Sequence, residues 1–295
     1  MDKLALKNYV EKNPRLIGMR ETSYPGLYVL KYKKRVFFDN VWNQFTEECR
    51  GTIVDQDFNV VSRPFTKIYN YGIESKAPRL AGSTNIVAYR KINGFMVAVT
   101  LYNDDLLVST TGSTDSPYVA MALEMIDRER YLRVCRQYPG QTFMFECVHP
   151  NDPHIIPETQ GMYLLGWRLN TWDSVVHPDP GGLEIYAELF GTLPVESLST
   201  TLAELTNLVK TVKHEGFVFY TANSVAAKIK SPYYLIKKFV ARNPRTDKLM
   251  RADIKETIEE EYYPLIDHIQ INIAEYTALD EQARLAWVRE FLEKQ

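Results

Sequence analysis

Cysteine is scarce in this chain, and its three residues, Cys49, Cys135 and Cys147, are scattered. An odd number of thiols without metal-ligand spacing predicts neither a disulfide framework nor a zinc site, and it favours a reduced, cytoplasmic compartment. The longest apolar runs are far too short to cross a bilayer. We also expect no secretion signal, because no basic segment followed by an apolar one opens the chain. The composition therefore excludes disulfide-rich secreted scaffolds and membrane-spanning proteins.

A large excess of one charge is also missing, since 35 Lys and Arg stand against 37 Asp and Glu. The net charge of −2 argues against a protein that coats nucleic acid without specificity. Basic residues nevertheless gather in two places, at Lys31–Arg35 and at 228–251, where eight Lys or Arg accompany one acid, Asp247. The shorter cluster is equally well explained as a solvated face, whereas the longer one favours contacts with phosphate groups.

Internal repeats and low-complexity segments are absent, and the pattern of apolar residues changes once, near Pro232. Before that point, short apolar runs separated by turn residues predict antiparallel strands. Hairpin turns are predicted at Asp55–Asn59, Asn93-Gly94 and Thr221–Ser224. This part of the chain is therefore expected to be rich in antiparallel sheet.

Helices are predicted at two points within the strand-rich part and throughout the remainder. Ser116 is a favourable N-cap for a helix over 117–137, and Thr201–Glu204 is a capping box for a helix over 202–212. The helices predicted beyond Pro232 cover 235–242, 254–263 and 280–294, with Pro264 as a break. The chain therefore reads as an α+β body, residues 1–232, followed by a small all-helical domain, residues 233–295.

The stretch AYRKINGFMVAV places Lys91 between a strand and an Asn-Gly turn. Its K-x-x-G pattern is uninformative alone, because a lysine beside a hairpin is common and the chain has a second copy at Lys213–Gly216. A lysine that attacks the α-phosphate of a nucleotide needs further groups. These are cations that favour the neutral amine and stabilise the phosphorus centre, carboxylates for a divalent metal, and an aromatic face for the base.

Groups of these kinds follow Lys91 at the ends of predicted strands. They are Glu146 in TFMFE, Trp167 in LLGWR, Glu215 in EGFVFY, and Lys228 and Lys230 in AAKIKS. The last two lysines are two residues apart, so they share one face of a strand. No equivalent set follows Lys213, and Lys91 is therefore the favoured nucleophile.

This ordered set resembles the motifs of the covalent nucleotidyltransferase superfamily of ATP-dependent ligases and capping enzymes. Two upstream stretches, ECRGTIVD with Arg50 and RPFTKIYNYG with Lys67, look like those of the phage tRNA-repair (RNA ligase 1-like) family. The resemblance covers roughly residues 40–232 and implies an antiparallel-sheet, ATP-grasp-like ligase domain. Only about 65 residues follow Lys230, and they read as helical. That is unlike the OB-fold of DNA ligases and capping enzymes, and it resembles the helical C-terminal domain of the phage RNA ligase.

The resemblance also implies a role for each site residue. Lys91 is expected to be the nucleophile, and Lys228 and Lys230 are expected to be catalytic groups that hold the α-phosphate. The residues implied in nucleotide binding are Arg50, Lys67, Asn93, Gly94, Glu146, Trp167, Lys228 and Lys230. The residues implied in binding Mg²⁺ or Mn²⁺ through water are Glu215, Glu146 and Asn93.

The activity that the resemblance implies is that of an ATP-dependent RNA ligase. Such an enzyme joins RNA 5′-phosphate and 3′-hydroxyl ends through a lysine–AMP intermediate and an RNA-adenylate. The expected setting is RNA repair, with a cleaved tRNA as substrate and an end-healing kinase/phosphatase as partner, in the host cytoplasm if a phage encodes the chain. The basic segment Lys237–Arg251 and the tail are expected to hold the RNA.

The sequence departs from the family pattern at three places. Asn93 replaces the usual Asp, Phe95 replaces a common Ser, and Thr110-Thr111 stand where phage relatives often have a basic residue. Asn93 keeps a carbonyl acceptor but lacks the charge that would hold a metal-bound water. Two alternatives therefore stay open. One is a nucleotide- or RNA-binding protein of this fold that has lost turnover, and the other is a different polynucleotide ligase or capping-type nucleotidyltransferase.

Overall fold

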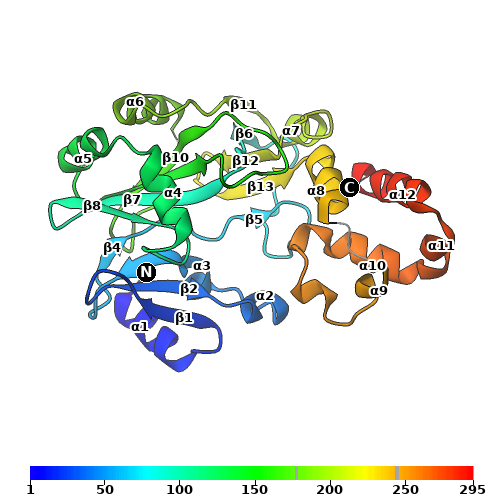
Figure 1. Ribbon diagram of the computed structural model, residues 1–295, viewed down its shortest axis with the longest axis horizontal. Coiled ribbons are helices and arrows are strands. Elements are labelled where there is room, and N and C mark those ends of the chain that lie inside the picture. The colour runs from blue at the N-terminus through cyan, green and yellow to red at the C-terminus, as the bar shows by residue number, and fades with distance from the viewer. Residues whose placement is uncertain (177–178, 243–245, 295) are drawn as a thin grey trace. The chain divides into compact units, whose positions relative to one another are not determined.

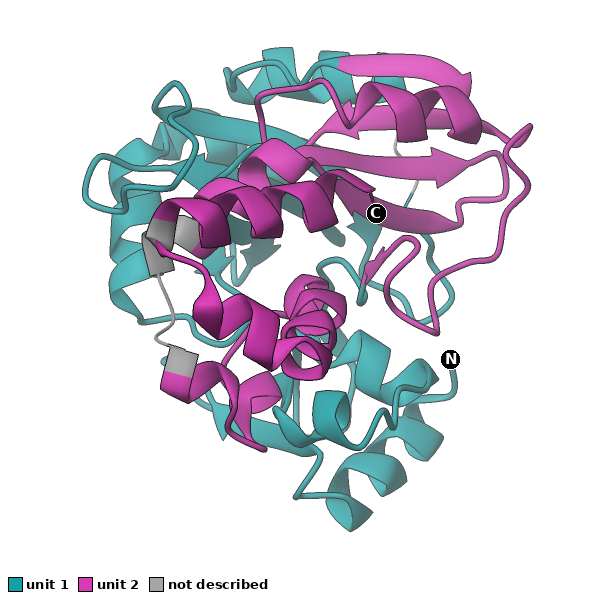
Figure 2. Cartoon of the chain, turned by 90° about the vertical axis from the view of Figure 1, so that its right-hand side faces the viewer, with its two compact units in different colours: residues 1–67, 92–196 teal, residues 68–91, 197–295 magenta. Residues whose placement is uncertain are grey.

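The computed structural model describes residues 1–176, 179–242 and 246–294, and it confirms the expected α+β class (Figure 1). Two compact units alternate along the chain. Unit 1 comprises Met1–Lys67 and Ile92–Glu196, and unit 2 comprises Ile68–Lys91 and Ser197–Gln295 (Figure 2). The chain therefore passes from one unit to the other inside the predicted nucleophile motif.

The first sheet of unit 1 has the strand order β1-β2-β3-β4 and is antiparallel throughout. Its strands are β1 (Ile17–Glu21), β2 (Tyr28–Tyr32), β3 (Arg50–Val54) and β4 (Val60–Ser62), with the helices α1 (Lys3–Lys12), α2 (Arg35–Phe38) and α3 (Gln44–Glu48) around them. The hairpin predicted at Asp55–Asn59 joins β3 to β4. The Asp55 carboxylate accepts hydrogen bonds from the backbone N–H groups of Asp57 and Asn59, which confirms this turn.

The second sheet of unit 1 has the order β10-β9-β7-β8 and is also antiparallel. Its strands are β7 (Phe95–Tyr102), β8 (Asp105–Ser109), β9 (Gln141–Val148) and β10 (Gly161–Leu169), and its helices are α4 (Pro117–Met125), α5 (Arg128–Gln137) and α6 (Pro180–Phe190). Phe143 and Phe145 of β9 pack edge-on against Phe190 of α6. An aromatic core thus lies between β9 and α6.

The single helix predicted over 117–137 is wrong, because α4 and α5 occupy this segment as two helices. Ile126 between them is extended, with φ −94° and ψ 124°. The Asp127 side chain accepts a hydrogen bond from the backbone N–H of Arg130 and so serves as the N-cap of α5. Aspartate favours a cap over a position inside a helix, and Asp127 is therefore the sequence signal for the break.

The described strands of unit 2 form one sheet with the order β11-β6-β12-β13-β5. They are β5 (Tyr69–Asn70), β6 (Asn85–Arg90), β11 (Ser197–Thr201), β12 (Gly216–Thr221) and β13 (Ala226–Lys230). These pairs are antiparallel except for β13 with β5, which is parallel. The hairpin predicted at Asn93-Gly94 is wrong, because the strands on either side of this turn, β6 and β7, belong to different sheets. Helix α7 (Leu202–Leu208) begins at the predicted capping box Thr201–Glu204 and packs Leu202 and Leu205 into the core of this sheet. It ends earlier than the predicted 212.

The C-terminal helices also belong to unit 2. They are α8 (Pro232–Arg242), α9 (Thr246–Leu249), α10 (Tyr263–Ile271), α11 (Ile273–Ala278) and α12 (Glu281–Lys294), with the 3-10 turns η1 (Ile254–Glu256) and η2 (Glu260–Tyr262). The helix predicted over 254–263 is wrong, since η1 and η2 occupy most of it. Pro264 lies in the first turn of α10. Backbone N–H groups in a first turn have no hydrogen-bond partner within the helix, so proline, which lacks this group, is tolerated there. The helix predicted over 280–294 is confirmed as α12.

The compact units do not follow the boundary that the sequence predicts at residue 232. The five-stranded sheet and the helices after it fall within one unit. The division into a nucleotidyltransferase domain, 1–232, and an RNA-binding domain, 233–295, therefore stays a prediction about function.

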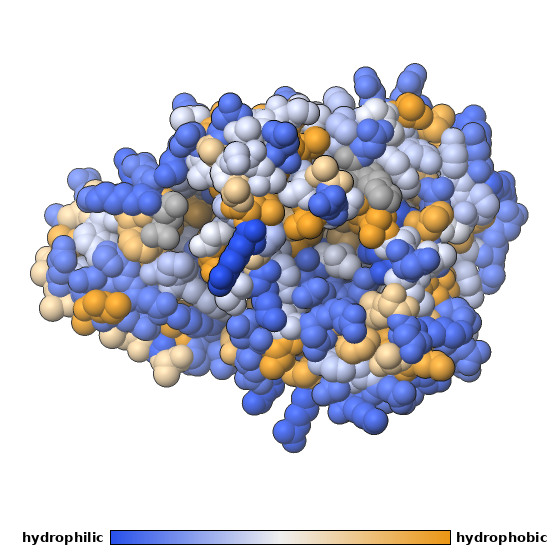
Figure 3. All heavy atoms as spheres, turned by 180° about the vertical axis from the view of Figure 1, so that it is seen from behind, coloured by the Kyte–Doolittle hydropathy of each residue, from blue (hydrophilic) through white to orange (hydrophobic). Residues whose placement is uncertain are grey.

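Polar and apolar side chains are distributed as in a typical globular chain. On the face shown in Figure 3, apolar residues occur in small separate groups among hydrophilic ones. None of the helices within the described residues combines the length and apolar character that a bilayer crossing requires. Cys49, Cys135 and Cys147 are buried in unit 1. Burial raises the pKa of Cys135 and of Cys147 to about 12, and it also raises that of Cys49.

Candidate active site

Lys91 follows β6, and strand pairing brings it to Glu215 and Gly216. β6 and β12 are antiparallel neighbours, and just beyond their last paired residues the backbone N–H of Lys91 donates to the Gly216 carbonyl at 2.9 Å. The Lys91 ammonium donates to Glu215 Oε2 at 3.0 Å. The side chain of Glu215 is 4% exposed, and that of Lys91 is 23% exposed. The second K-x-x-G copy, Lys213–Gly216, thus supplies the carboxylate partner of Lys91.

Gly216 is required because a neighbouring backbone leaves no room for a side chain. Its φ is +135°, and a Cβ atom there would lie 2.1 Å from the carbonyl oxygen of Ile229 in β13. Lys230 lies opposite Gly216 in the antiparallel register. Its Nζ is 3.6 Å from Glu215 Oε1. The Glu-Gly pair therefore places one carboxylate between the ammonium groups of Lys91 and Lys230.

The electrostatics of this cluster keep Glu215 ionised. Burial alone would raise the pKa of its carboxyl group, but Lys91 and Lys230 outweigh burial and hold this pKa below its ordinary value. Burial would likewise lower the pKa of the Lys230 ammonium, but Glu261 and Glu215 raise it. Each of these buried charges has a partner of opposite sign, which is the arrangement that buried charges need.

Lys228 lies on the same strand as Lys230, two residues earlier and opposite Val218. Side chains alternate along a strand, so the two lysines share one face, as the sequence predicts. The backbone carbonyl of Lys228 accepts a hydrogen bond from the Tyr71 N–H at 2.8 Å. Its charge contributes to lowering the pKa of Glu261, so Lys228 acts electrostatically on the same cluster.

Glu261 is a member of the cluster that sequence reasoning missed. It lies in η2, its carboxylate pairs with the Lys230 ammonium, and it is 3.8 Å from the ammonium of Lys238 in α8. Burial would raise the pKa of Glu261, but Lys230, Lys238 and Lys228 lower it to about 2. The acidic run 259–261, which follows the long basic segment, was the available signal. No local feature of either run indicates which of their side chains form ion pairs.

In unit 1, β7 and β9 bring Asn93, Gly94 and Glu146 together. The backbone N–H of Gly94 donates to Glu146 Oε1 at 3.1 Å. A Cβ atom at Gly94 would lie 2.3 Å from the carbonyl oxygen of Cys147, so β9 approaches too closely for another residue. Asn93 is buried, and its Nδ2 has no hydrogen-bond partner among the described residues. Such a position suits a polar ligand or an ordered water.

Arg50 and Lys67, which the resemblance implies in nucleotide binding, also lie in unit 1. Arg50 begins β3 and is half-buried. Lys67 is buried, and its ammonium lies 4.6 Å from the ring centre of Phe37 and 4.7 Å from that of Trp42. Aromatic faces stabilise an ammonium electrostatically, so these rings offset part of the cost of burying the charge of Lys67.

Trp167 of β10 packs against helix α6. Its ring centre is 4.7 Å from that of Tyr186. A Cβ atom at Gly182 would meet the Trp167 ring at 2.5 Å, so the helix lies directly on this side chain. The structure thus gives Trp167 a packing role, and its use as a stacking face for adenine stays a prediction.

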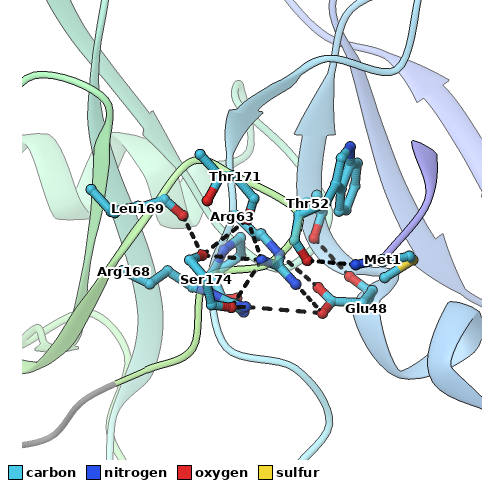
Figure 4. Close-up of polar contacts among 10 residues, drawn as sticks. Met1, Glu48, Thr52, Arg63, Arg168, Leu169, Thr171 and Ser174 are labelled. Atoms are coloured by element: carbon cyan, nitrogen blue, oxygen red, sulfur yellow. Dashed lines mark hydrogen bonds and ion pairs between the residues drawn. The ribbon is translucent and has the colours of Figure 1, made fainter.

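A buried network of charged groups, drawn in Figure 4, holds the start of β3. Arg63 donates to Glu48 Oε2 at 3.1 Å and to the Ser174 carbonyl at 3.0 Å, and Arg168 donates to the same carbonyl at 2.5 Å. Burial lowers the pKa of the Arg168 guanidinium to about 10, although Glu48 opposes this effect. Glu48 stands two residues before Arg50. The network therefore fixes the backbone beside a predicted site residue, and sequence reasoning gave it no role.

The predicted site residues thus fall into two groups. Unit 2 holds Lys91, Glu215, Lys228 and Lys230. Unit 1 holds Arg50, Lys67, Asn93, Gly94, Glu146 and Trp167. The predicted metal-binding set therefore draws on both units. Within the described part of the chain, no three His, Cys, Asp or Glu side chains converge as a metal cage.

A family model described as RNA ligase matches residues 48–234, which is more than half of the chain. This range contains every residue of both groups. The match agrees with the resemblance drawn from the motifs.

Two curated proteins and one solved structure illustrate the similarity. A protein of Autographa californica nuclear polyhedrosis virus, assigned as a bifunctional polynucleotide kinase/RNA ligase, is 24% identical over 301 residues, which cover 93% of this chain and 40% of that protein. RNA ligase 1 of bacteriophage TS2126 is 29% identical over 138 residues, which cover 41% of this chain and 34% of that protein. The chain thus spans two fifths or less of these relatives.

The solved structure is that of an archaeal ATP-dependent RNA ligase, with a TM-score of 0.63 and 13% identity over 97% of this chain and 76% of that chain. At this identity the likeness shows the fold alone.

Proposed function

The chain belongs to the RNA ligase family, and we propose that it is an ATP-dependent RNA ligase that joins 5′-phosphate and 3′-hydroxyl ends through a covalent lysine–AMP intermediate. The observation that supports this most is the cluster of Lys91, Glu215 and Lys230, in which one buried carboxylate holds a candidate nucleophile and a phosphate-binding cation. Attack on phosphorus needs such a cation, because negative charge accumulates on the phosphate oxygens. Since the chain spans 40% and 34% of its two relatives, their other named activities are not assigned to it.

In the first proposed step, the Nζ lone pair of Lys91 attacks the α-phosphorus of ATP. A nitrogen–phosphorus bond forms, the bond to the bridging oxygen of the β-phosphate breaks, and pyrophosphate leaves. Lys91 must release one proton before the attack and a second one after it, and its partly exposed side chain can pass both to solvent. Lys228 and Lys230 neutralise the charge on the α-phosphate oxygens.

The second and third steps transfer AMP and then seal the RNA. A 5′-phosphate oxygen of the RNA attacks the phosphorus of lysine–AMP, the phosphorus–nitrogen bond breaks, and Lys91 takes up a proton. The product is an RNA-adenylate. An RNA 3′-hydroxyl then attacks the RNA 5′-phosphorus, a phosphodiester forms, AMP leaves and the hydroxyl proton is released.

A divalent cation, Mg²⁺ or Mn²⁺, is the proposed cofactor, with Glu215, Glu146 and Asn93 as its protein contacts. These residues offer oxygen donors, which are the ligands that Mg²⁺ prefers. The carboxamide oxygen of Asn93 can accept a hydrogen bond from a water of such a cation, whereas its unpartnered Nδ2 is a donor and suits an oxygen of the nucleotide. A small protein donor set also fits Mg²⁺, which dehydrates reluctantly and keeps several waters. When bound, the cation would supply positive charge at the phosphates.

The exposed part of the basic segment Lys237–Arg251 is the proposed RNA contact. Lys237, Lys248 and Arg251 are exposed. Lys238 is buried and paired with Glu259 and Glu261, so it serves inside the protein instead. The remaining basic side chains of the segment, Arg242 and Arg245, lie outside the side chains that the structure describes. A cleaved tRNA is the proposed substrate and an end-healing kinase or phosphatase the proposed partner, and the viral relative is named for both kinase and ligase activities.

One alternative is supported by a specific observation. Asn93 is a buried neutral amide where the resemblance leads us to expect an aspartate. A protein that binds nucleotide or RNA without turnover could retain every contact described above. A second alternative is a DNA-joining or capping activity, and substrate preference separates it from RNA joining.

Covalent labelling tests the proposal directly. The protein, freed of bound AMP, is incubated with ATP labelled at the α-phosphate and with Mg²⁺ or Mn²⁺, and is then denatured. We expect acid-labile label on the wild type, at least about 10³-fold less on Lys91→Ala, and the wild-type level on the control Lys213→Ala. Label retained by Lys91→Ala would assign the nucleophile to another residue. No label from ATP or GTP on the wild type would favour the binding protein.

Substrate comparison then separates the ligase classes. Single-stranded RNA with a 5′-phosphate, nicked duplex DNA and RNA with a triphosphate end are offered to the labelled protein. We expect sealing of the RNA alone. Preferential sealing of nicked DNA, or AMP transfer to the triphosphate end, would reassign the activity.

A further inference from the structure

Charges of opposite sign alternate along a row of side chains in unit 2. In order, the row is Lys91, Glu215, Lys230, Glu261, Lys238 and Glu259. The first three come from the ends of β6 and β13 and from the residue before β12, and the last three come from α8 and the segment at η2. The C-terminal segment therefore reaches the candidate nucleophile through consecutive ion pairs.

Lys230 is held from more than one side within this row. Its side chain is 10% exposed, Glu261 accepts a hydrogen bond from its ammonium, and Glu215 approaches to 3.6 Å. The ring of Tyr234 lies 5.3 Å away. An ammonium has three N–H donors. Glu261 takes one of them, whereas Glu215 at 3.6 Å is too distant to take another, so donors remain for a phosphate oxygen. The direction of those donors is set by the hydrogen bond to Glu261 and by the charge of Glu215.

We propose that Glu261 is a positioning residue for the adenylyl-transfer steps, acting through Lys230 without touching the nucleotide. The inference rests on the function proposed above. In the proposed function Glu215 also contacts the divalent cation, and its partner Lys91 must release a proton before it attacks. Glu261 has neither task, so it keeps the Lys230 ammonium charged and oriented while the contacts of Glu215 change.

The segment around Glu261 has a second anchor that does not involve its charge. The neighbouring Tyr262 is buried, and its hydroxyl donates to the Leu235 carbonyl at 2.7 Å. Glutamine at 261 would keep the size of the side chain and a carbonyl acceptor, and it would lose only the charge. We therefore expect Glu261→Gln to fold.

Separate effects on the rate and on the apparent KM for ATP distinguish positioning from packing. The charged and titratable groups around Lys230 are Glu215 beside β12, Glu261 in η2, Tyr234 and Lys238 in α8, and Lys228 on its own strand. Without the carboxylate charge of Glu261, the Lys230 ammonium loses the ion pair that orients it and keeps the more distant Glu215. Adenylylation should then be slower and ATP should bind more weakly, because the ammonium no longer stands in a fixed direction toward the α-phosphate.

The experiment measures single-turnover formation of lysine–AMP on the full chain at neutral pH over a range of ATP concentrations. The matched control is Glu259→Gln, which removes an ion pair of the same segment to Lys238 but leaves the contacts of Lys230 intact. For Glu261→Gln at neutral pH we expect the rate to fall about tenfold and the apparent KM for ATP to rise about fivefold. Glu259→Gln should stay within about twofold of the wild type.

Each outcome bears on one proposal or on both. Absence of label on the wild type overturns the function and the positioning role together. A labelled wild type with Glu261→Gln indistinguishable from Glu259→Gln overturns the positioning role alone. Thermal unfolding reports whether the variants fold. If Glu261→Gln does not fold, Glu261→Asp, whose carboxylate is withdrawn by one methylene, takes its place. A lower rate and a higher KM for ATP in Glu261→Asp support the role, and unchanged values overturn it.

Discussion

The two groups of predicted site residues are held in place by different physical means. In unit 2, Lys91, Glu215 and Lys230 are oriented by buried ion pairs. In unit 1, Gly94 and Glu146 are oriented by a backbone hydrogen bond and by the close approach of β9. Ion pairs orient side chains only while each partner is charged, whereas backbone contacts do not depend on lysine charges. The two groups should therefore respond differently to substitution and to pH.

Alanine at the two glycines tests the one feature that both groups share, a close backbone approach, and has the largest expected effect. Gly216→Ala combines a Cβ clash with a positive φ, whereas Gly94→Ala introduces only the clash. We expect losses in the free energy of unfolding of about 3 kcal/mol and about 2 kcal/mol respectively, with a fall in label formation in both. Thermal or urea unfolding and the labelling assay measure these effects.

Gly140→Ala is the control for the glycine comparison. Gly140 has φ +72°, but a Cβ atom there meets nothing within 4 Å. We expect it to lose only about 1 kcal/mol, from backbone conformation alone. If Gly216→Ala lost no more than Gly140→Ala, the approach of β13 would not be the constraint.

As the pH is lowered, the ion-paired group of unit 2 should weaken before the group of unit 1. The pKa of Glu261 is about 2 in the fold against an ordinary 4.5, so its stabilising effect is complete above about pH 4.5 and is lost as the pH falls through 2. The pKa of Glu215 is displaced in the same direction. Glu261 alone should contribute about 3 kcal/mol to this loss. Urea unfolding between pH 5 and 2.5 should show a shallower pH dependence for Glu261→Gln than for the wild type, and equal slopes would contradict the assignment.

Asn93→Asp changes unit 1 and has the smallest expected effect. A carboxylate at 93 restores the charge that can hold a metal-bound water, so label formation with Mg²⁺ should be kept or rise by about two- to fivefold. The rate is measured against Mg²⁺ concentration. A large loss would show that the site is built around the neutral amide.

Much of the unit 2 group could be predicted because its parts lie at strand ends that pair with one another. The spacing of Lys228 and Lys230 places both on one face of β13, and the hairpin before β13 is visible in the sequence. Once β6 pairs with β12, Lys91 and Glu215 must meet. Strand alternation and turn residues are local signals, so a sequence displays them directly.

The rest of the site depends on tertiary contacts that no local pattern displays. Glu261 finds Lys230 across thirty-one positions of sequence, after a segment that reads as a plain helix but forms two 3-10 turns. Lys67 is buried beside two aromatic rings that stand more than twenty positions before it. Lys and Glu side chains are usually exposed, so the sequence predicts that Lys67 and Glu261 face solvent. Each is buried only because partners distant in the sequence compensate its charge.

The three cysteines have a practical consequence for following this protein at work. Each is at most 1% exposed, and burial keeps its thiol from forming the reactive thiolate. Maleimide reagents should therefore not react with the cysteines of the native protein. Ile271 at the end of α10 is 80% exposed, so a cysteine placed there would be the preferred point of attachment for a fluorophore. The proposed binding of RNA at the C-terminal helices could then be tested by fluorescence without first removing any native thiol.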